Sequence, residues 1–183
     1  LNLITGGASR LIVDNNSRIS LSNNDTSADG GTDSSSANTI FGRHAGTTLF
    51  GSSNAGYENV LIGHKAGNLL TTGDNNVFVG SGAGLVMIEG TNNIAIGYQS
   101  MDAMVGQTGE GNIGHYNIAL GTNSMGAVNA GAHANAQSDG NIAIGENALL
   151  GGEFSGDSDL IGNIAIGYQA LDGTTTNAHT GTI

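Results

Sequence analysis

The stretch Asn93-Ile94-Ala95-Ile96-Gly97-Tyr98-Gln99-Ser100-Met101 decides how the chain folds, because it recurs almost unchanged from Asn163 to Leu171. The shared form is Asn, three mostly apolar residues, Gly, two variable residues, a small residue, and then Gly, Met or Leu. Seven copies occur, and they begin at Asn38, Asn59, Asn76, Asn93, Asn117, Asn141 and Asn163. This repetition indicates one structural module used many times along the chain.

Each copy predicts a short β-strand between two corners. Three apolar residues are too few for an amphipathic helix, whereas Asn and Gly readily take the left-handed backbone conformations of turns. Successive asparagines are 17 to 24 residues apart, which suits a coil of two short strands and two turns. Residues 38–183 are therefore predicted to form an all-β, parallel β-solenoid with about one rung per repeat.

Stacked rungs predict ladders of identical residues. The seven asparagines are expected to form a hydrogen-bonded ladder, and residues such as Ile94 and Ile96 a continuous apolar core. The corner glycines form a second column, made of Gly42, Gly63, Gly80, Gly97, Gly121, Gly145 and Gly167.

The middle residue of each apolar triplet is the basis of a predicted subunit interface. Side chains alternate along a strand, so the middle residue of a lone solenoid should point outward and be polar. It is instead always apolar: Ile40, Leu61, Phe78, Ala95, Ala119, Ala143 and Ala165. These residues are predicted to meet other copies of the chain around a symmetry axis.

The ninth residue of the repeat divides the copies into two groups. It is Gly in the first three copies and Met or Leu in the other four. Because the coils after a Met or Leu ending are longer, this apolar residue is expected to anchor surface excursions such as 102–116 and 126–140. Loops on a rigid scaffold often carry binding sites.

Residues 1–37 lack the repeat. Two β-type runs, at 10–14 and 18–21, flank a possible tight turn and predict a hairpin-like segment, while residues 22–37 form a polar linker. Asp25 and Asp29 in this linker have the spacing of a calcium loop. Ser36 stands where an EF-hand needs a bidentate Glu, so a solvated turn is the preferred interpretation.

Composition and charge exclude several classes of function. The chain has four Lys and Arg residues and fifteen Asp and Glu residues, so its formal charge is −11. This negative charge argues against nucleic-acid binding. The chain has no Cys, so it has no disulfide or thiolate metal site. No apolar run reaches the roughly 20 residues of a membrane helix, and no signal peptide is visible. The first and last residues of the sequence suggest that it is a segment of a longer protein.

No catalytic motif is found, so the sequence predicts no enzyme activity, no cofactor and no metal site. The histidines occupy different repeat positions and are interpreted as solvated, although near a symmetry axis any of them could bind a metal or an anion. They are His44, His64, His115, His133 and His179. Tyr98 and Tyr168 share one repeat position and could form a carbohydrate-binding stripe, with simple surface packing as the preferred interpretation.

The phrase Asn-Ile-Ala-Ile-Gly, followed by a small residue, resembles the head repeat of trimeric autotransporter adhesins of the YadA-like family. The resemblance covers residues 38–171 and implies a left-handed parallel β-roll in a three-fold trimer. The Gly-Tyr-Gln-Ala-Leu ending and the run from Ser9 to Asp14 are similar to tail-fibre proteins of marine bacteriophages.

These resemblances imply an extracellular, homotrimeric virion tail fibre that presents a surface to a host glycan or protein receptor, with no membrane insertion. A bacterial adhesin head is the alternative. The enzymatic alternative is the left-handed β-helix of hexapeptide acyltransferases, whose pattern resembles Ile96-Gly97-Tyr98-Gln99-Ser100. Its six-residue phase is broken by repeat spacings of 17 and 22.

Overall fold

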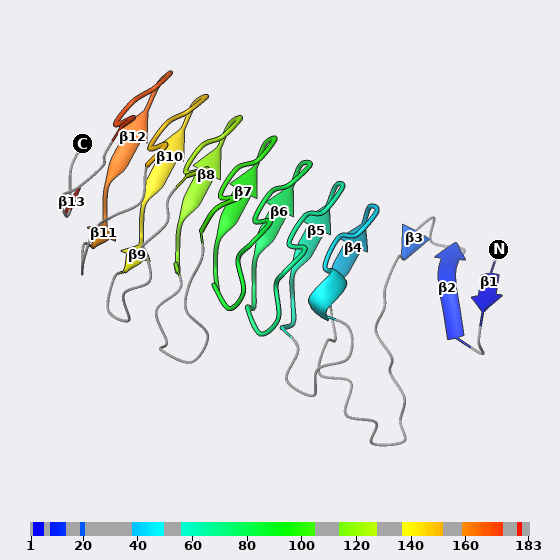
Figure 1. Ribbon diagram of the computed structural model, residues 1–183. Helices are drawn as coiled ribbons and strands as arrows, with labels where there is room; N and C mark the ends of the chain where they lie inside the picture. Colours follow the sequence, from blue (N-terminus) through cyan, green and yellow to red (C-terminus); the bar gives the residue numbers. More distant parts are fainter. Residues whose placement is uncertain are drawn as a thin grey trace.

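The computed structural model describes residues 38–49, 56–104, 114–127, 137–151 and 159–173 in full, and the backbone of residues 2–5, 8–13, 19–20 and 179–180. Within these residues the regular structure is β throughout, apart from one 3₁₀ turn, η1 (Thr47–Leu49). Figure 1 shows the repeat strands stacked side by side in chain order.

The N-terminal strands form an antiparallel sheet in the order β1-β2-β3. They are β1 (Asn2–Thr5), β2 (Ala8–Val13) and β3 (Ile19–Ser20). Ile12 pairs with Ser20 and Val13 with Ile19, so the two runs expected to form a hairpin do pair, and β1 adds a strand that the sequence did not reveal. The linker with Asp25 and Asp29 lies outside the described residues.

The seven apolar triplets form one parallel sheet, in the order β12-β10-β8-β7-β6-β5-β4. Its strands are β4 (Thr39–Phe41), β5 (Val60–Ile62), β6 (Val77–Val79), β7 (Ile94–Ile96), β8 (Ile118–Leu120), β10 (Ile142–Ile144) and β12 (Ile164–Ile166). Equivalent residues pair, as Ala95 does with Ala119. The prediction of an all-β chain with stacked parallel strands is confirmed.

The coils near the C-terminal end contribute strands to a second, shorter parallel sheet. It contains β9 (Ser138–Asp139), β11 (Leu160–Ile161) and β13 (His179–Thr180), in the order β13-β11-β9. Gly140 and Gly162, both with positive φ, form the corners between this sheet and the main one. These coils therefore carry strands on two sides.

The repeat asparagines form a buried ladder at the start of the strands. Asn93 donates from its backbone N–H and from its side-chain Nδ2 to Oδ1 of Asn76, at 3.0 and 3.1 Å. Its Nδ2 also donates to the carbonyl oxygen of Gly114 at 2.9 Å. The same pair of bonds to the preceding asparagine joins all seven residues, with lengths between 2.8 and 3.1 Å.

The corner glycines stack at the other end of the strands. Gly80 has a φ of +140°, and a Cβ atom there would overlap the carbonyl oxygen of Gly97 on the next rung. The column therefore needs glycine for its backbone conformation and for the close approach of successive rungs. Similar overlaps would occur along the column from Gly42 to Gly145.

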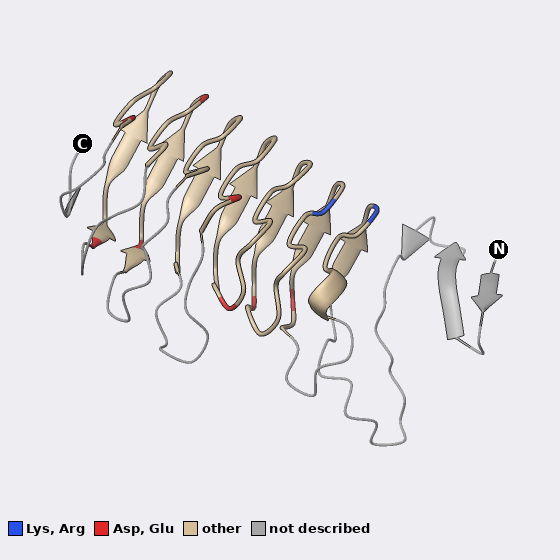
Figure 2. Ribbon diagram, in the orientation of Figure 1, with Lys and Arg blue, Asp and Glu red and all other residues tan. Residues whose placement is uncertain are grey.

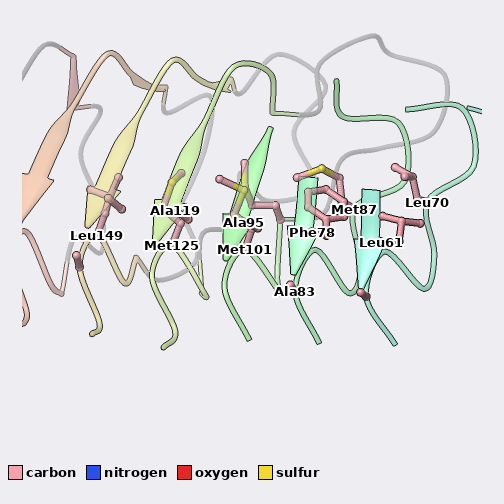
Figure 3. Close-up of a cluster of buried hydrophobic side chains, with 14 of the residues drawn as sticks. Leu61, Leu70, Phe78, Ala83, Met87, Ala95, Met101, Ala119, Met125 and Leu149 are labelled. Carbon is pink, nitrogen blue, oxygen red and sulfur yellow. The ribbon is translucent and has the colours of Figure 1, made fainter. Parts of the chain in front are cut away.

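The middle residues of the triplets lie inside the coil of their own chain, as Figure 3 shows for Leu61, Phe78, Ala95 and Ala119. All except the partly buried Ile40 are almost completely buried. The prediction that Ile40, Leu61, Phe78, Ala95, Ala119, Ala143 and Ala165 form the subunit interface is therefore wrong. Strand alternation separates two faces but does not say which one is inside, and here the turn after each glycine folds back over the middle residue.

The ninth residue of each repeat fills the same interior. Where the middle residue is large, as in Phe78, the ninth residue is Gly84; where it is Ala95, the ninth is Met101, fully buried. The Met or Leu ending therefore occupies core volume that Ala leaves empty, and its role as an anchor of the surface excursions stays a prediction. Residues 105–113 and 128–136 of those excursions lie outside the described part.

A further apolar column stands three residues beyond the ninth position. Its described members are Leu49, Leu70, Met87 and Met104, all buried. The sequence analysis missed this column, although its constant distance of eleven residues from the ladder asparagine is a usable signal.

Candidate interaction surface

The outward face of the seven-stranded sheet is built from the first and third residues of the triplets. These residues are Thr39, Phe41, Val60, Ile62, Val77, Val79, Ile94, Ile96, Ile118, Leu120, Ile142, Ile144, Ile164 and Ile166. We call this set the outer sheet face. Thr39 is its single polar member, and no charged residue belongs to it.

Side chains on the outer sheet face are partly or largely exposed in the single chain. The exposed fraction is 42% for Ile96, 37% for Ile144 and 65% for Ile166. Residues at the first position, such as Ile94, are half-buried, except for the exposed Thr39. Ile94 and Ile96 were predicted to form the core of the coil, and that prediction is wrong: they lie on the outer face, between the asparagine ladder and the glycine column.

Beyond the glycine column, the sixth and seventh residues of each repeat form a row of turn tips. Tyr98 and Tyr168 are 55% and 69% exposed in this row. The tips after β8 and β10, which carry Thr122 and Glu146, stand between them. The two tyrosines therefore do not form a continuous aromatic stripe.

The opposite corner carries a second set of hydrogen bonds between rungs. Asp74 Oδ1 accepts from the backbone N–H of Tyr57 at 2.9 Å, and Asp139 Oδ1 accepts from that of His115 at 2.8 Å. His115 Nδ1 accepts from the backbone N–H of Thr91 at 3.2 Å. These acceptors, two residues before a ladder asparagine, were missed because Asp and His do not form one recognisable pattern.

Charged residues make up only 10% of the chain. In the fully described ranges, no three His, Cys, Asp or Glu residues are close enough to hold a metal ion. His133 and the His179 side chain lie outside those ranges.

Burial raises the pKa of Asp102, which follows Met101, to about 6. A backbone hydrogen bond lowers this pKa by a smaller amount.

No helix in the described part of the chain is long and apolar enough to cross a bilayer. Comparisons with protein-family models, with curated proteins and with solved structures give no match. The outer sheet face is therefore the principal guide to function.

Proposed function

We propose that this chain is a non-enzymatic, self-associating rod of a trimeric extracellular fibre, which attaches a virion to its host. The outer sheet face is the observation that carries this proposal. A continuous apolar surface across seven strands is unusual for a protein that works alone.

Covering the outer sheet face would stabilise an assembly. Transfer of a partly exposed isoleucine side chain out of water contributes about 1 kcal/mol, so the third-position residues together contribute several kcal/mol. The absence of charge from the face means that this gain is not opposed by desolvation of ionised groups.

Another copy of the same chain is the best-matched occupant. The outer sheet face consists of ridges of Ile and Val repeated at the spacing of parallel strands, about 4.8 Å. A second surface with the same spacing interdigitates with these ridges along their whole length. Three copies are proposed because the repeats resemble those of trimeric heads, and the tail-fibre role rests on the resemblance of the repeat endings.

Sedimentation of the purified chain tests this proposal. The wild-type chain is expected to sediment as three copies at micromolar concentration. Ile144→Asp should keep its β-type circular dichroism but sediment as a single chain, because its charge interrupts the outer sheet face. Gln169→Glu adds the same charge on an exposed turn tip and should remain trimeric. A monomeric wild-type chain refutes the proposal.

A further inference from the structure

The few positive charges of the described solenoid are concentrated at one place. Arg43 and Lys65 are its only Lys or Arg residues, and Figure 2 shows them on neighbouring turn tips, after β4 and β5. His44 and His64 occupy the remaining positions of the same two tips. All four side chains are exposed. We call these four residues the basic tip cluster.

The backbone holds the basic tip cluster in a fixed arrangement. The N–H of Lys65 donates to the carbonyl oxygen of Arg43 at 2.9 Å, which stacks one tip on the next. The carbonyl oxygen of His44 accepts from Thr47 Oγ1 and from Asn68 Nδ2, both at 3.0 Å. The rings of His44 and His64 lie 6.3 Å apart. Four possible donors are therefore presented by a preorganised scaffold.

The cluster has no neutralising partner in the described part of the chain, where neither Arg43 nor Lys65 forms an ion pair. The next tips carry no carboxylate until Glu146, although the whole chain has a formal charge of −11. Two cations on adjacent rungs repel each other, so a bound anion would stabilise this arrangement. A guanidinium beside an ammonium group suits a sulfate or phosphate ester.

The tips that continue the row are neutral and polar. Ser81, Tyr98, Gln99, Thr122 and Asn123 supply hydroxyl, amide and phenol groups. Asn123 Nδ2 donates to Oδ1 of Asn147 on the next rung at 3.2 Å. Such groups hydrogen-bond to sugar hydroxyls, and an exposed tyrosine ring packs on the apolar face of a sugar.

We propose that the row of turn tips binds an acidic polysaccharide, with a sulfate or phosphate ester held by Arg43 and Lys65 and the sugar chain lying along the neutral tips. This rests on the attachment role proposed above and names its ligand class. The binding residues belong to the tips and not to the outer sheet face, so binding and assembly can be tested separately.

Binding to immobilised dextran sulfate, with neutral dextran as the reference surface, tests the site. The wild-type chain is expected to bind dextran sulfate, more weakly as salt increases, and not to bind dextran. Arg43→Gln combined with Lys65→Gln should weaken binding at least about tenfold, a loss of about 1.4 kcal/mol. Gln suits the backbone at the Lys65 position, since Gln99 and Gln169 occupy it in other repeats with similar positive φ.

Arg10→Gln combined with Arg18→Gln is the matched control, because removing two cations takes the formal charge from −11 to −13 in both double variants. The control should bind like the wild type. Equal losses in the two double variants, or no wild-type binding, would overturn the proposal. Sedimentation of the same samples separates the two ideas: a monomer that binds through Arg43 and Lys65 refutes only the trimeric rod, and a trimer that does not bind refutes only this site.

Discussion

Gly84 lies directly against the ring of Phe78, so that a Cβ atom on Gly84 would approach Phe78 Cε2 to 2.5 Å. One rung further, the residue equivalent to Phe78 is Ala95 and the residue equivalent to Gly84 is Met101. The two positions share one interior volume. In each rung one large side chain fills this volume, either from the middle position of the strand or from the ninth position in the turn. The stacked coils therefore keep a common size.

Alanine substitutions at two glycines of the same turn distinguish the stability cost of overpacking from the stability cost of backbone strain. Gly82 and Gly84 have φ values of +73° and +59°, so either substitution costs about 1 kcal/mol for the left-handed conformation. A Cβ on Gly82 meets only Gln99, at 3.4 Å. Gly84→Ala should therefore lower the free energy of unfolding by about 1–3 kcal/mol more than Gly82→Ala, because of overpacking. Equal losses in urea denaturation would argue against a tightly filled interior.

Exchanging the large and small residues of one rung should restore much of the stability that each single change removes. Ala95→Leu overpacks the interior and should cost about 1–3 kcal/mol. Met101→Gly leaves a cavity that should cost about 2–5 kcal/mol of stability. Glycine also relieves the strain of the left-handed backbone at this position, where φ is +52°, and this offsets about 1 kcal/mol of the cost. The double variant reproduces the Leu61 and Gly67 pair of another rung. A double-mutant cycle should give a favourable coupling of at least about 1 kcal/mol, and strict additivity would contradict shared volume.

The asparagine ladder can be tested with two neighbouring isosteric substitutions. Asn93→Asp replaces the Nδ2 donor with a carboxylate oxygen facing Asn76 Oδ1 and the carbonyl of Gly114, in a buried site. Asn92→Asp adds the same charge at an exposed corner. Asn93→Asp should lower the free energy of unfolding by about 3 kcal/mol or more, and Asn92→Asp by no more than about 0.5 kcal/mol. Similar melting temperatures for the two variants would contradict the ladder.

Asp102 gives a prediction about pH. Its pKa is raised from 3.8 to about 6, so the folded chain keeps a proton that the unfolded chain releases. Stability from this group is therefore greatest below about pH 4 and is lost as pH rises towards 6. Asp102→Asn should stabilise the chain at pH 7 by about 1 kcal/mol, after allowance for partial exposure, and by nothing at pH 3.5. A gain independent of pH would exclude titration of Asp102 as the cause.

The strands and their register followed from the sequence because each repeat carries its own corner residues. Gly80 and Asn93, for example, mark the end of one strand and the start of the next rung. The sequence did not show which face of each strand points into the coil. Ile96 is larger and more apolar than Ala95 and was assigned to the core, yet the narrow coil accepts Ala95 together with Met101.

The candidate surface could be predicted only in part. A second apolar face was correctly inferred from the uniformly apolar triplets, but it was attributed to the wrong residues. The basic tip cluster was not visible because Arg43 and Lys65 occupy different positions of the repeat, and stacking brings them together on adjacent tips. The cluster therefore arises from a contact between two rungs, which the pattern of a single repeat does not show.

Thiol alkylation tests most directly whether the outer sheet face is covered by other copies. The chain has no Cys, so Ile144→Cys and Gln169→Cys each introduce a single thiol, and both positions are exposed in the single chain. In the micromolar assembly, the Ile144→Cys thiol should react at least about tenfold more slowly than the Gln169→Cys thiol, equivalent to about 1.4 kcal/mol of protection. Dilution below the association range should remove this difference. Equal alkylation rates at both concentrations would contradict burial of the outer sheet face between copies.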